Sequence, residues 1–315
     1  MLPGYATPFA FYFFDSFSYI TTVAFFLNRR KVYSATKTVV NLCTRITPRI
    51  YVGSKTIIFE ILLLVASSLA ILSIFIIFFF YQEWNLFLRI LHAPYFVDEV
   101  THTWIVVFSL VSIHTWSFCT CFISVLLCYN SFIAAGDLLK AYGSTIQDLT
   151  DRKSIIRSLE LFGDVSNCVK RIDKALNSCV FFLFGTVVGN FFAAVSVLFS
   201  ESRSYHTPVA SVYVGLTLLG GMAIILVLTT GGNSVTNGMK LLKSMLLEGN
   251  RKIAGQSQEV ISSFTLLSDC VRGSSLSVSG CEMFTINKRL ALTIGGMIVT
   301  YSFLLFQLSG KPLTT

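Results

Sequence analysis

Six long apolar stretches constrain this chain more than any other feature, because each could cross a lipid bilayer as a helix. A spanning helix needs about 20 predominantly apolar residues. Of the 315 residues, 54% are hydrophobic and only 13% are charged. The stretches are residues 4–27, 56–80, 104–130, 178–200, 211–230 and 290–309. They predict an all-α fold, a polytopic membrane helical bundle of about six spans that forms a single domain over residues 1–315.

The basic residues between these stretches predict the orientation of the bundle. Residues 28–55, 136–175 and 231–289 each hold seven Lys or Arg, whereas only three lie in the other connections and the C-terminal tail. Basic loops stay on the cytosolic side of a membrane. The three basic segments are therefore expected in the cytosol and both ends of the chain outside the cell. The net charge of +8 is explained by basic residues that set the membrane topology and meet anionic lipid headgroups. Nucleic acid is therefore not an expected partner.

The cytosolic segments are predicted to be helical rather than plain linkers. In residues 136–175 apolar side chains recur among charges, which is typical of amphipathic helices that extend the third and fourth spans. Met239–Leu247 and Val260–Leu267 have the same pattern, and Glu248-Gly249-Asn250 between them is expected to break the helix. Together these segments predict a sizeable helical layer beneath the membrane.

No motif for cofactor or catalytic chemistry is present. Cys119 and Cys121 have the spacing of a metal pair, but they lie in an apolar segment without close acidic neighbours, so no metal site and no cofactor are expected. The sequence lacks an H-E-x-x-H zinc motif, a phosphate-binding loop and a G-x-S-x-G elbow. We therefore expect that the protein is not an enzyme.

Three residues within the predicted spans are candidates for a ligand pocket. Ionisable side chains in lipid are costly and therefore often functional. Asp15 lies in the middle of the first span, although a short span or a water-filled vestibule would also explain it. His114 lies among Ser and Thr residues in the third span, where a hydrogen-bonded core histidine is the alternative. Trp116 lies two residues further on, and packing is its alternative role.

The last apolar stretch has a polar stripe on an otherwise lipid-compatible helix. Thr293, Thr300 and Gln307 are spaced by seven residues, with Gly296 and Leu304 between them. Positions with this spacing share one narrow face of a helix. Such a stripe lines either a water-filled path or a tight contact with another helix.

The end of this stretch resembles the arthropod gustatory receptors. That family ends its last helix with Thr-Tyr, several apolar residues, Gln and Phe, and the matching run here is Thr300-Tyr301-Ser-Phe-Leu-Leu-Phe306-Gln307. Leu308 stands where most members have Phe, as it does in the related insect odorant co-receptor. The preceding segment, from Gly280 to Leu290, is similar to the family's Gly-x-Phe-x-Ile/Leu-Asn/Asp run.

The resemblance implies a function and an assembly. Gustatory receptors are ligand-gated cation channels with seven spans, a cytosolic N-terminus and an extracellular C-terminus. They form tetramers in the plasma membrane of chemosensory cells. Their last helices line one pore, their cytosolic helices anchor the subunits together, and their earlier helices enclose the ligand. The chain is therefore expected to detect a small-molecule tastant and to conduct cations, as a homo- or hetero-tetramer with related subunits.

The resemblance also assigns residues to the gate. Gln307 and Leu308 match the gate positions, Leu304 lies one turn before them, and the two threonines of the stripe continue the pore lining. A ring of four leucine side chains closes a pore by dewetting. Tyr301 lies off the stripe and is expected to hydrogen-bond or pack between helices.

Six predicted spans against the family's seven leave alternatives open. An extracellular start fits a chain that begins just before the family's second span, so the family's first helix is expected to be absent. A non-conducting or truncated family member is one alternative. A G-protein-coupled-type seven-helix receptor is another, although the extracellular C-terminus and the lack of Asn-Pro-x-x-Tyr in the last span oppose it. A transporter would need inverted repeats that are not evident, and in a structural protein the stripe would be a packing seam.

Overall fold

The computed structural model describes residues 6–46, 99–147, 149, 151–198 and 208–308. Within these residues the chain forms six helices and one short hairpin. In chain order the elements are α1 (Ala6–Ile46), α4 (Glu99–Ile146), α5 (Arg152–Leu198), α6 (Pro208–Ile253), α7 (Gln258–Gly273), β1 (Ser279–Gly280), β2 (Phe284–Thr285) and α8 (Lys288–Leu308).

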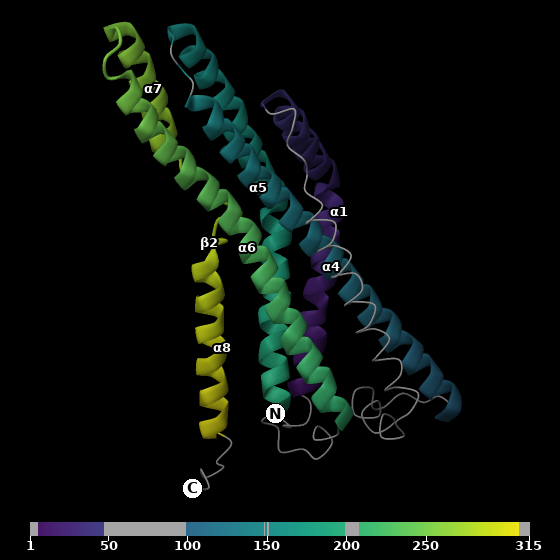
Figure 1. Cartoon of the computed structure of the whole chain (residues 1–315). Coiled ribbons are helices and arrows are strands. Elements are labelled where there is room, and N and C mark those ends of the chain that lie inside the picture. Colours follow the sequence, from purple (N-terminus) through teal and green to yellow (C-terminus); the bar gives the residue numbers. More distant parts are fainter. Residues whose placement is uncertain (1–5, 47–98, 148, 150, 199–207, 309–315) are drawn as a thin grey trace.

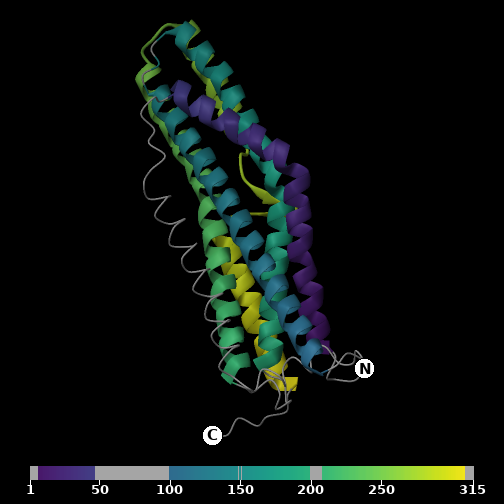
Figure 2. The ribbon, with the colours of Figure 1, turned by 90° about the vertical axis from the view of Figure 1, so that its right-hand side faces the viewer.

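The helices form an elongated all-α bundle (Figures 1 and 2). Helices α1, α4, α5 and α6 have 41 to 48 residues each. At 1.5 Å per residue they are about 60–70 Å long, roughly twice the thickness of a bilayer's hydrocarbon core. Each long helix therefore has room for a membrane span and an extension into water. The shorter α8 lies beside α6, and its C-terminal end is at the same end of the bundle as the start of α1.

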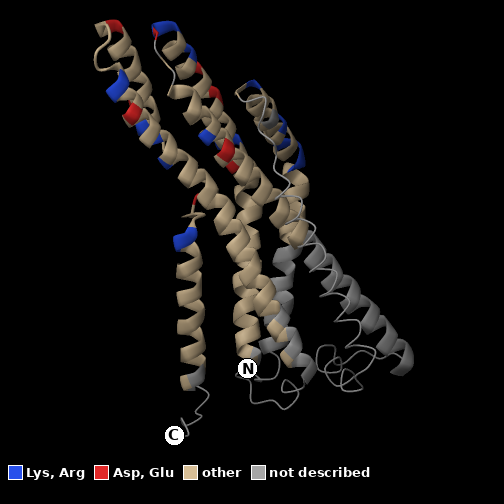
Figure 3. Ribbon diagram, viewed as in Figure 1, with Lys and Arg blue, Asp and Glu red and all other residues tan. Residues whose placement is uncertain are grey.

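Charged residues gather at the opposite end of the bundle, in the helix extensions (Figure 3). There α4 continues to Ile146 and α5 begins at Arg152, which confirms the helical prediction for residues 136–175. Asp151 precedes the first turn of α5, and its Oδ2 accepts the backbone N–H of Ser154 at 3.2 Å. This bond satisfies a donor that the start of a helix leaves free. Hydrogen bonding with the side chain of Ser154, and then with its backbone, lowers the pKa of Asp151.

The predicted break at Glu248-Gly249-Asn250 is wrong. Helix α6 continues through these residues to Ile253, and the turn follows at residues 254–257. The reason is packing, because α7 folds back on this part of α6. A Cβ atom at Gly249 would lie 2.9 Å from Cζ of Phe264, a fully buried residue of α7. Glycine is present here to admit the Phe264 ring, and the helix tolerates it because the packing outweighs its weak helix preference.

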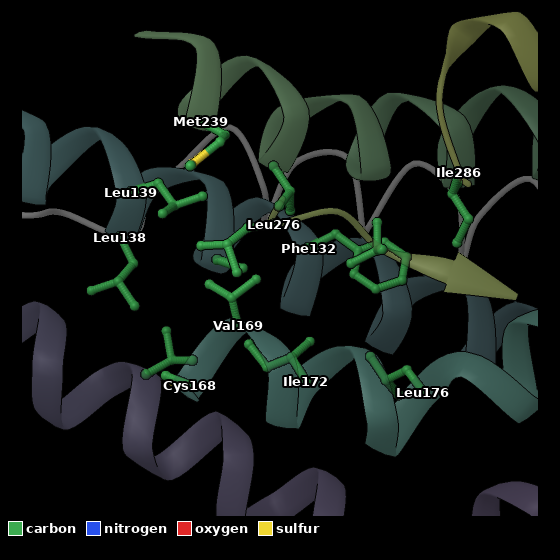
Figure 4. Close-up of a cluster of buried hydrophobic side chains, with 14 of the residues drawn as sticks. Phe132, Leu138, Leu139, Cys168, Val169, Ile172, Leu176, Met239, Leu276 and Ile286 are labelled. Atoms are coloured by element: carbon green, nitrogen blue, oxygen red, sulfur yellow. The ribbon is translucent and has the colours of Figure 1, made fainter. Parts of the chain in front are cut away.

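The core of the charged end is apolar and closely packed. Leu138 and Leu139 of α4 lie across from Val169 and Ile172 of α5, and Met239 of α6 closes the cluster (Figure 4). Burial of a side chain of this size stabilises a fold by about 1.5–3 kcal/mol. The core therefore holds the extensions of α4, α5 and α6 together without help from lipid.

One hydrogen bond and one close approach fix the position of α4 in this core. The hydroxyl of the buried Tyr142 donates to the carbonyl of Ser158 in α5 at 2.9 Å. On the other side α4 touches α6 backbone to backbone, because a Cβ atom at Gly238 would lie only 2.8 Å from the carbonyl oxygen of Gly136. Small residues permit such helix contacts in membrane proteins.

The described helices agree in length and composition with a membrane bundle. Among the described residues, α4, α5, α6 and α8 are long and apolar enough to cross a membrane. The described parts of five predicted spans lie in α1, α4, α5, α6 and α8. The remaining one, residues 56–80, lies outside the described residues.

Candidate functional site

Helix α8 has one face toward the bundle and a wide face away from it. Ile294 is buried, and Ile298 and Tyr301 are half-buried against α5 and α6. The other face carries large apolar side chains that no described part of this chain covers. Leu292 is 78% exposed and Val299 is 68% exposed. An apolar face of this size needs lipid or another protein copy against it.

The polar stripe predicted from the sequence lies on this uncovered face. Thr293, Thr300, Leu304 and Gln307 are all exposed. The two threonines donate to their own helix, Thr293 to the carbonyl of Arg289 at 3.0 Å and Thr300 to the carbonyl of Gly296 at 2.9 Å. Each hydroxyl oxygen therefore keeps its lone pairs for a partner outside the helix. Leu308 is the last residue of α8, and its side chain is not described.

Tyr301 connects the distal half of α8 to α5. Its ring meets the ring of Phe192 edge to face, with centroids 4.5 Å apart. Its hydroxyl lies 3.1 Å from the hydroxyl of Ser196. Since Ser196 already donates to the carbonyl of Phe192 at 2.7 Å, the Tyr301 hydroxyl is the donor in this pair. Tyr301 thus makes an inter-helix hydrogen bond on the covered side of α8, away from the stripe.

The near end of α8 is set by the β1–β2 hairpin, which the sequence did not predict. The hairpin pairs Ser279 with Thr285 and Gly280 with Phe284 in antiparallel register. Two residues later Asn287 caps α8, and its Oδ1 accepts the backbone N–H of Arg289 at 2.9 Å. The position of the hairpin therefore decides where α8 begins.

A carboxylate of α5 holds this hairpin. Asp173 Oδ1 accepts the backbone N–H of Ser279 at 2.6 Å and the Ser279 hydroxyl at 3.1 Å. One turn further along α5, the carbonyl of Asn177 accepts the backbone N–H of Cys281 at 3.3 Å. The chain has to fold sharply to make both contacts. Cys281 and Glu282 therefore have φ angles of 48° and 61°, in the left-handed region.

Aromatic packing holds the other strand of the hairpin. The Phe284 ring stacks on Phe181 with centroids 6.4 Å apart and meets Phe184 edge to face at 5.5 Å. Gly280 lies under the same ring, where any side chain would clash with it. The hairpin is thus held on α5 by both hydrogen bonds and ring contacts.

Helix α6 contacts the hairpin from the other side. Ile286 is buried, and its backbone N–H donates to the carbonyl of Val278 at 2.9 Å. Its carbonyl and side chain lie against Gly232, where a Cβ atom would overlap the Ile286 backbone. The hairpin and the residues that lead from it into α8, together called the root of α8, are therefore enclosed between α5 and α6.

Burial sets the electrostatics of the carboxylate that holds the hairpin. Asp173 lies outside the predicted span 178–200, and desolvation raises its pKa above the ordinary aspartate value. The hydrogen bonds from Ser279 oppose this shift, and the nearby Glu282 adds to it. Sequence reasoning had no signal for Asp173, because it is one of six acidic residues in residues 136–175.

The three predicted pocket residues belong to two helices. Asp15 lies in α1, and His114 and Trp116 lie in α4. Their side chains are outside the described residues, so the ligand pocket remains a prediction. Among the residues that the structure describes, no group of three His, Cys, Asp or Glu is placed to hold a metal ion.

Two solved structures of the insect olfactory receptor OR5 from Machilis hrabei share this arrangement of helices. One, in complex with eugenol, is similar with a TM-score of 0.56 at 17% identity, over 97% of this chain and 87% of that chain. The other has a TM-score of 0.59 at 18% identity, over 96% and 80%. This chain has the fold of an insect olfactory receptor. No family model and no curated protein sequence matches it.

The olfactory-receptor fold supports the first inferences from the sequence. It confirms, at the level of fold, the predicted relation to the insect odorant and gustatory receptors. It also agrees with a multi-pass membrane protein whose helices form an all-α bundle.

Proposed function

We propose that the chain is a subunit of a gustatory-receptor-like, ligand-gated cation channel in which α8 lines the pore. One observation carries this proposal. Thr293, Thr300, Leu304 and Gln307 form a polar stripe on the face of α8 that no other part of the described chain covers. A helix with polar groups on an uncovered, otherwise apolar face needs water or a second protein copy on that side.

A ring of copies satisfies both needs at once. In a homo- or hetero-tetramer the stripes of the four α8 helices would face a common axis, and the flanking apolar side chains would pack between subunits. Gln307 amides would meet the passing cations, and Leu308 would close the path by excluding water. The fold is compatible with this proposal, since the similar structures are those of an insect olfactory receptor.

The ligand in this proposal is a small organic molecule, and the cell is chemosensory. The OR5 receptor was solved in complex with eugenol, so eugenol belongs in a test panel with sugars and bitter compounds. The residues proposed to face the ligand are Asp15, His114 and Trp116. The plasma membrane, with the basic helix extensions in the cytosol and the C-terminus outside, is the proposed location.

Whole-cell recording tests the channel function. Cells that express the full chain would be exposed to the panel, with Leu308→Ala as a variant whose gate is opened. Leu292→Ala is the matched control, because Leu292 is an exposed leucine of the same helix outside the stripe. We expect a ligand-evoked cation current in the wild type, a ligand-independent leak in Leu308→Ala and wild-type behaviour in Leu292→Ala. Silence in all three with the protein at the cell surface would contradict a channel formed by this chain alone.

A glycosylation assay tests the proposed orientation. A flexible extension with an Asn-x-Thr acceptor would be added after Thr315, and the same extension would be inserted between Ala254 and Gly255 in the turn before α7. Only acceptors on the extracellular side are modified. We expect modification of the C-terminal acceptor alone. The opposite pattern would support the topology of a G-protein-coupled receptor.

A further inference from the structure

A polar groove lies between α1 and α5, in the helix extensions and away from α8. Its volume is about 270 Å³. Eight residues line it: Thr38, Asn41, Leu42 and Arg45 from α1, and Asp164, Asn167, Cys168 and Arg171 from α5. Only Leu42 and Cys168 are apolar, and both are buried at its floor. The groove is therefore a hollow with an apolar base and polar walls.

Two arginines in this hollow form no ion pair with the residues that the structure describes. In the part of the chain that the structure describes, the ion pairs are Asp137 with Lys140 and Arg152 with Glu259. Neither Arg45 nor Arg171 takes part in one. An arginine side chain presents up to five donors in a planar fork that fits phosphate oxygens. Two such forks at one hollow favour an anionic ligand.

The spacing of the polar residues indicates what kind of anion would fit. Helices α1 and α5 run in opposite directions, since α1 ends at the end of the bundle where α5 begins (Figures 1 and 2). Arg45 is seven residues after Thr38, and Arg171 is seven residues after Asp164. Each interval is about 10 Å along a helix. The two arginines are thus at opposite ends of the groove.

The groups between the arginines suit hydroxyls rather than further phosphates. Asn41 and Asn167 supply amides, which both donate and accept. Asp164 is not between the arginines: it lies at the end of the groove where Arg45 lies, and its carboxylate repels phosphate there. Cationic ends with a neutral middle match a ring of hydroxyls that carries phosphate groups at its edges.

We propose that this groove binds a phosphorylated polyol of the inositol polyphosphate class. Arg45 and Arg171 would each hold one phosphate group, while the two asparagines would bind the free hydroxyls between them. In the topology proposed above the groove faces the cytosol, and only the compartment of the ligand rests on that topology. The binding itself is independent of channel activity, so it can be tested even if no current is found.

Distance from the membrane favours a free ligand over a lipid headgroup. The apolar part of α1 ends at Leu27, and Asn41 follows 14 residues later. That separation is about 20 Å along the helix. A headgroup anchored in the bilayer would have to extend that far from the surface. A soluble polyphosphate reaches the groove without this constraint.

A bound ligand would also act on the part of α5 that holds the hairpin before α8. Arg171 is two residues before Asp173, which binds the hairpin at the root of α8. A ligand that bridges α1 and α5 at Arg171 would restrict the motion of α5 at that point. The groove is thus placed to change the freedom of the hairpin.

Thermal unfolding of the purified full chain tests the binding. The chain would be studied in detergent with increasing myo-inositol 1,4-bisphosphate, which carries phosphates on opposite edges of the ring and free hydroxyls between them, and with sulfate at the same ionic strength as the control. A ligand that binds only the folded state raises the unfolding temperature as its concentration rises. We expect a saturable increase with the inositol phosphate and none with sulfate. An equal response to both anions would show nonspecific screening and overturn the proposal.

Variants at the groove make the test specific. The double substitution Arg45→Gln with Arg171→Gln should weaken binding at least tenfold, whereas Arg251→Gln, an exposed arginine at the end of α6, should not change it. Asp164→Asn removes the carboxylate that repels the phosphate at Arg45 and should strengthen binding of the bisphosphate several-fold. If the double variant does not fold, Asp164→Asn decides alone. Unchanged affinity in Asp164→Asn, or retained affinity in a folded double variant, would refute the assignment.

A vesicle assay separates the two sources of the same chemistry. The chain would be reconstituted into vesicles with and without phosphatidylinositol bisphosphate, and the rise in unfolding temperature caused by the soluble inositol bisphosphate would be measured in both. An equal rise in both vesicles supports a free ligand. Stabilisation by the lipid that the soluble compound cannot displace would overturn the choice of a soluble ligand.

Discussion

The backbone N–H of Ser279 donates to Oδ1 of Asp173 at 2.6 Å, although the two residues are 106 positions apart in the chain. This bond fastens the hairpin at the root of α8 to α5. Toward the other end of α8, the Tyr301 hydroxyl lies 3.1 Å from the hydroxyl of Ser196, which also belongs to α5. Helix α8 is thus attached to α5 at two points, and most of the surface between them is exposed.

Removing the carboxylate should loosen the root of α8. In Asp173→Ala the backbone N–H of Ser279 loses its acceptor in a half-buried site, which costs about 1–3 kcal/mol. Asp173→Asn is the matched control, because its amide oxygen can still accept that bond. We expect a lower unfolding temperature and an altered ligand sensitivity or leak current in Asp173→Ala, and near wild-type behaviour in Asp173→Asn. Equal effects of both variants would show that charge matters here rather than the hydrogen bond.

The protonation of Asp173 should also be visible in the pH dependence of stability. Burial raises its pKa in the folded protein above the ordinary value of 3.8. At pH values between the ordinary pKa of the unfolded chain and the raised pKa of the folded protein, the folded state binds more protons than the unfolded state. Stability therefore falls as pH rises through this window. Relative to Asp173→Asn, the wild type should therefore gain stability as pH is lowered from neutral into this window. Unfolding temperatures of the two proteins across pH 4–7 measure the difference, and the reverse trend would contradict a raised pKa.

The two faces of α8 could be predicted from sequence because a helix converts regular spacing into one face. The seven-residue interval of Thr293, Thr300 and Gln307 is a local property, and the structure places all three on the exposed side. The helical extension of residues 136–175 was predictable for the same reason. Periodicity of this kind needs no knowledge of partners in the fold.

The attachment of α8 could not be predicted, because it depends on contacts between distant residues. Strands of two residues each have no periodicity to detect. Asp173 and Ser279 become partners only after α5 and the hairpin meet. The break expected at Gly249 was wrong for a related reason, since the residue that justifies this glycine, Phe264, is on another helix. Tertiary packing overrides local preference at both places.

The distal attachment of α8 should show a coupling energy between two hydroxyls. Tyr301→Phe keeps the ring on Phe192 and removes only the donor to Ser196. We expect the substitution to destabilise the protein by about 0.5–1.5 kcal/mol. A double-mutant cycle with Ser196→Ala isolates the bond, because the two losses should not add when both partners are absent. Full additivity of the two single variants would disprove a direct interaction.

The contact between α4 and α6 should be intolerant of a single methyl group. Gly238→Ala would place a Cβ atom 2.8 Å from the carbonyl oxygen of Gly136, and 3.1 Å from Cβ of Leu139. Backbone cannot yield as a flexible side chain can, so we expect a loss of about 1–3 kcal/mol. Gly163→Ala is the matched control, because a Cβ atom there meets nothing within 4 Å. In that helix interior alanine should be neutral or stabilising by up to about 1 kcal/mol. Unfolding temperatures of the two variants give the comparison.

The last prediction concerns the ion path itself. Gln307 is exposed near the end of α8, in line with Thr300 and Thr293. If four such amides face the pore axis, Gln307→Ala removes carbonyl oxygens that help replace the hydration shell of a passing cation. We expect altered conductance or altered permeability ratios among Na⁺, K⁺ and Ca²⁺, measured by reversal potentials in bi-ionic solutions, with unchanged surface expression. Phe303→Ala, an exposed residue of the same helix outside the stripe, should leave those ratios unchanged. If instead Gln307→Ala retains wild-type ratios and conductance while Phe303→Ala alters them, the pore is lined by the neighbouring face of α8 and the polar stripe is a seam between subunits.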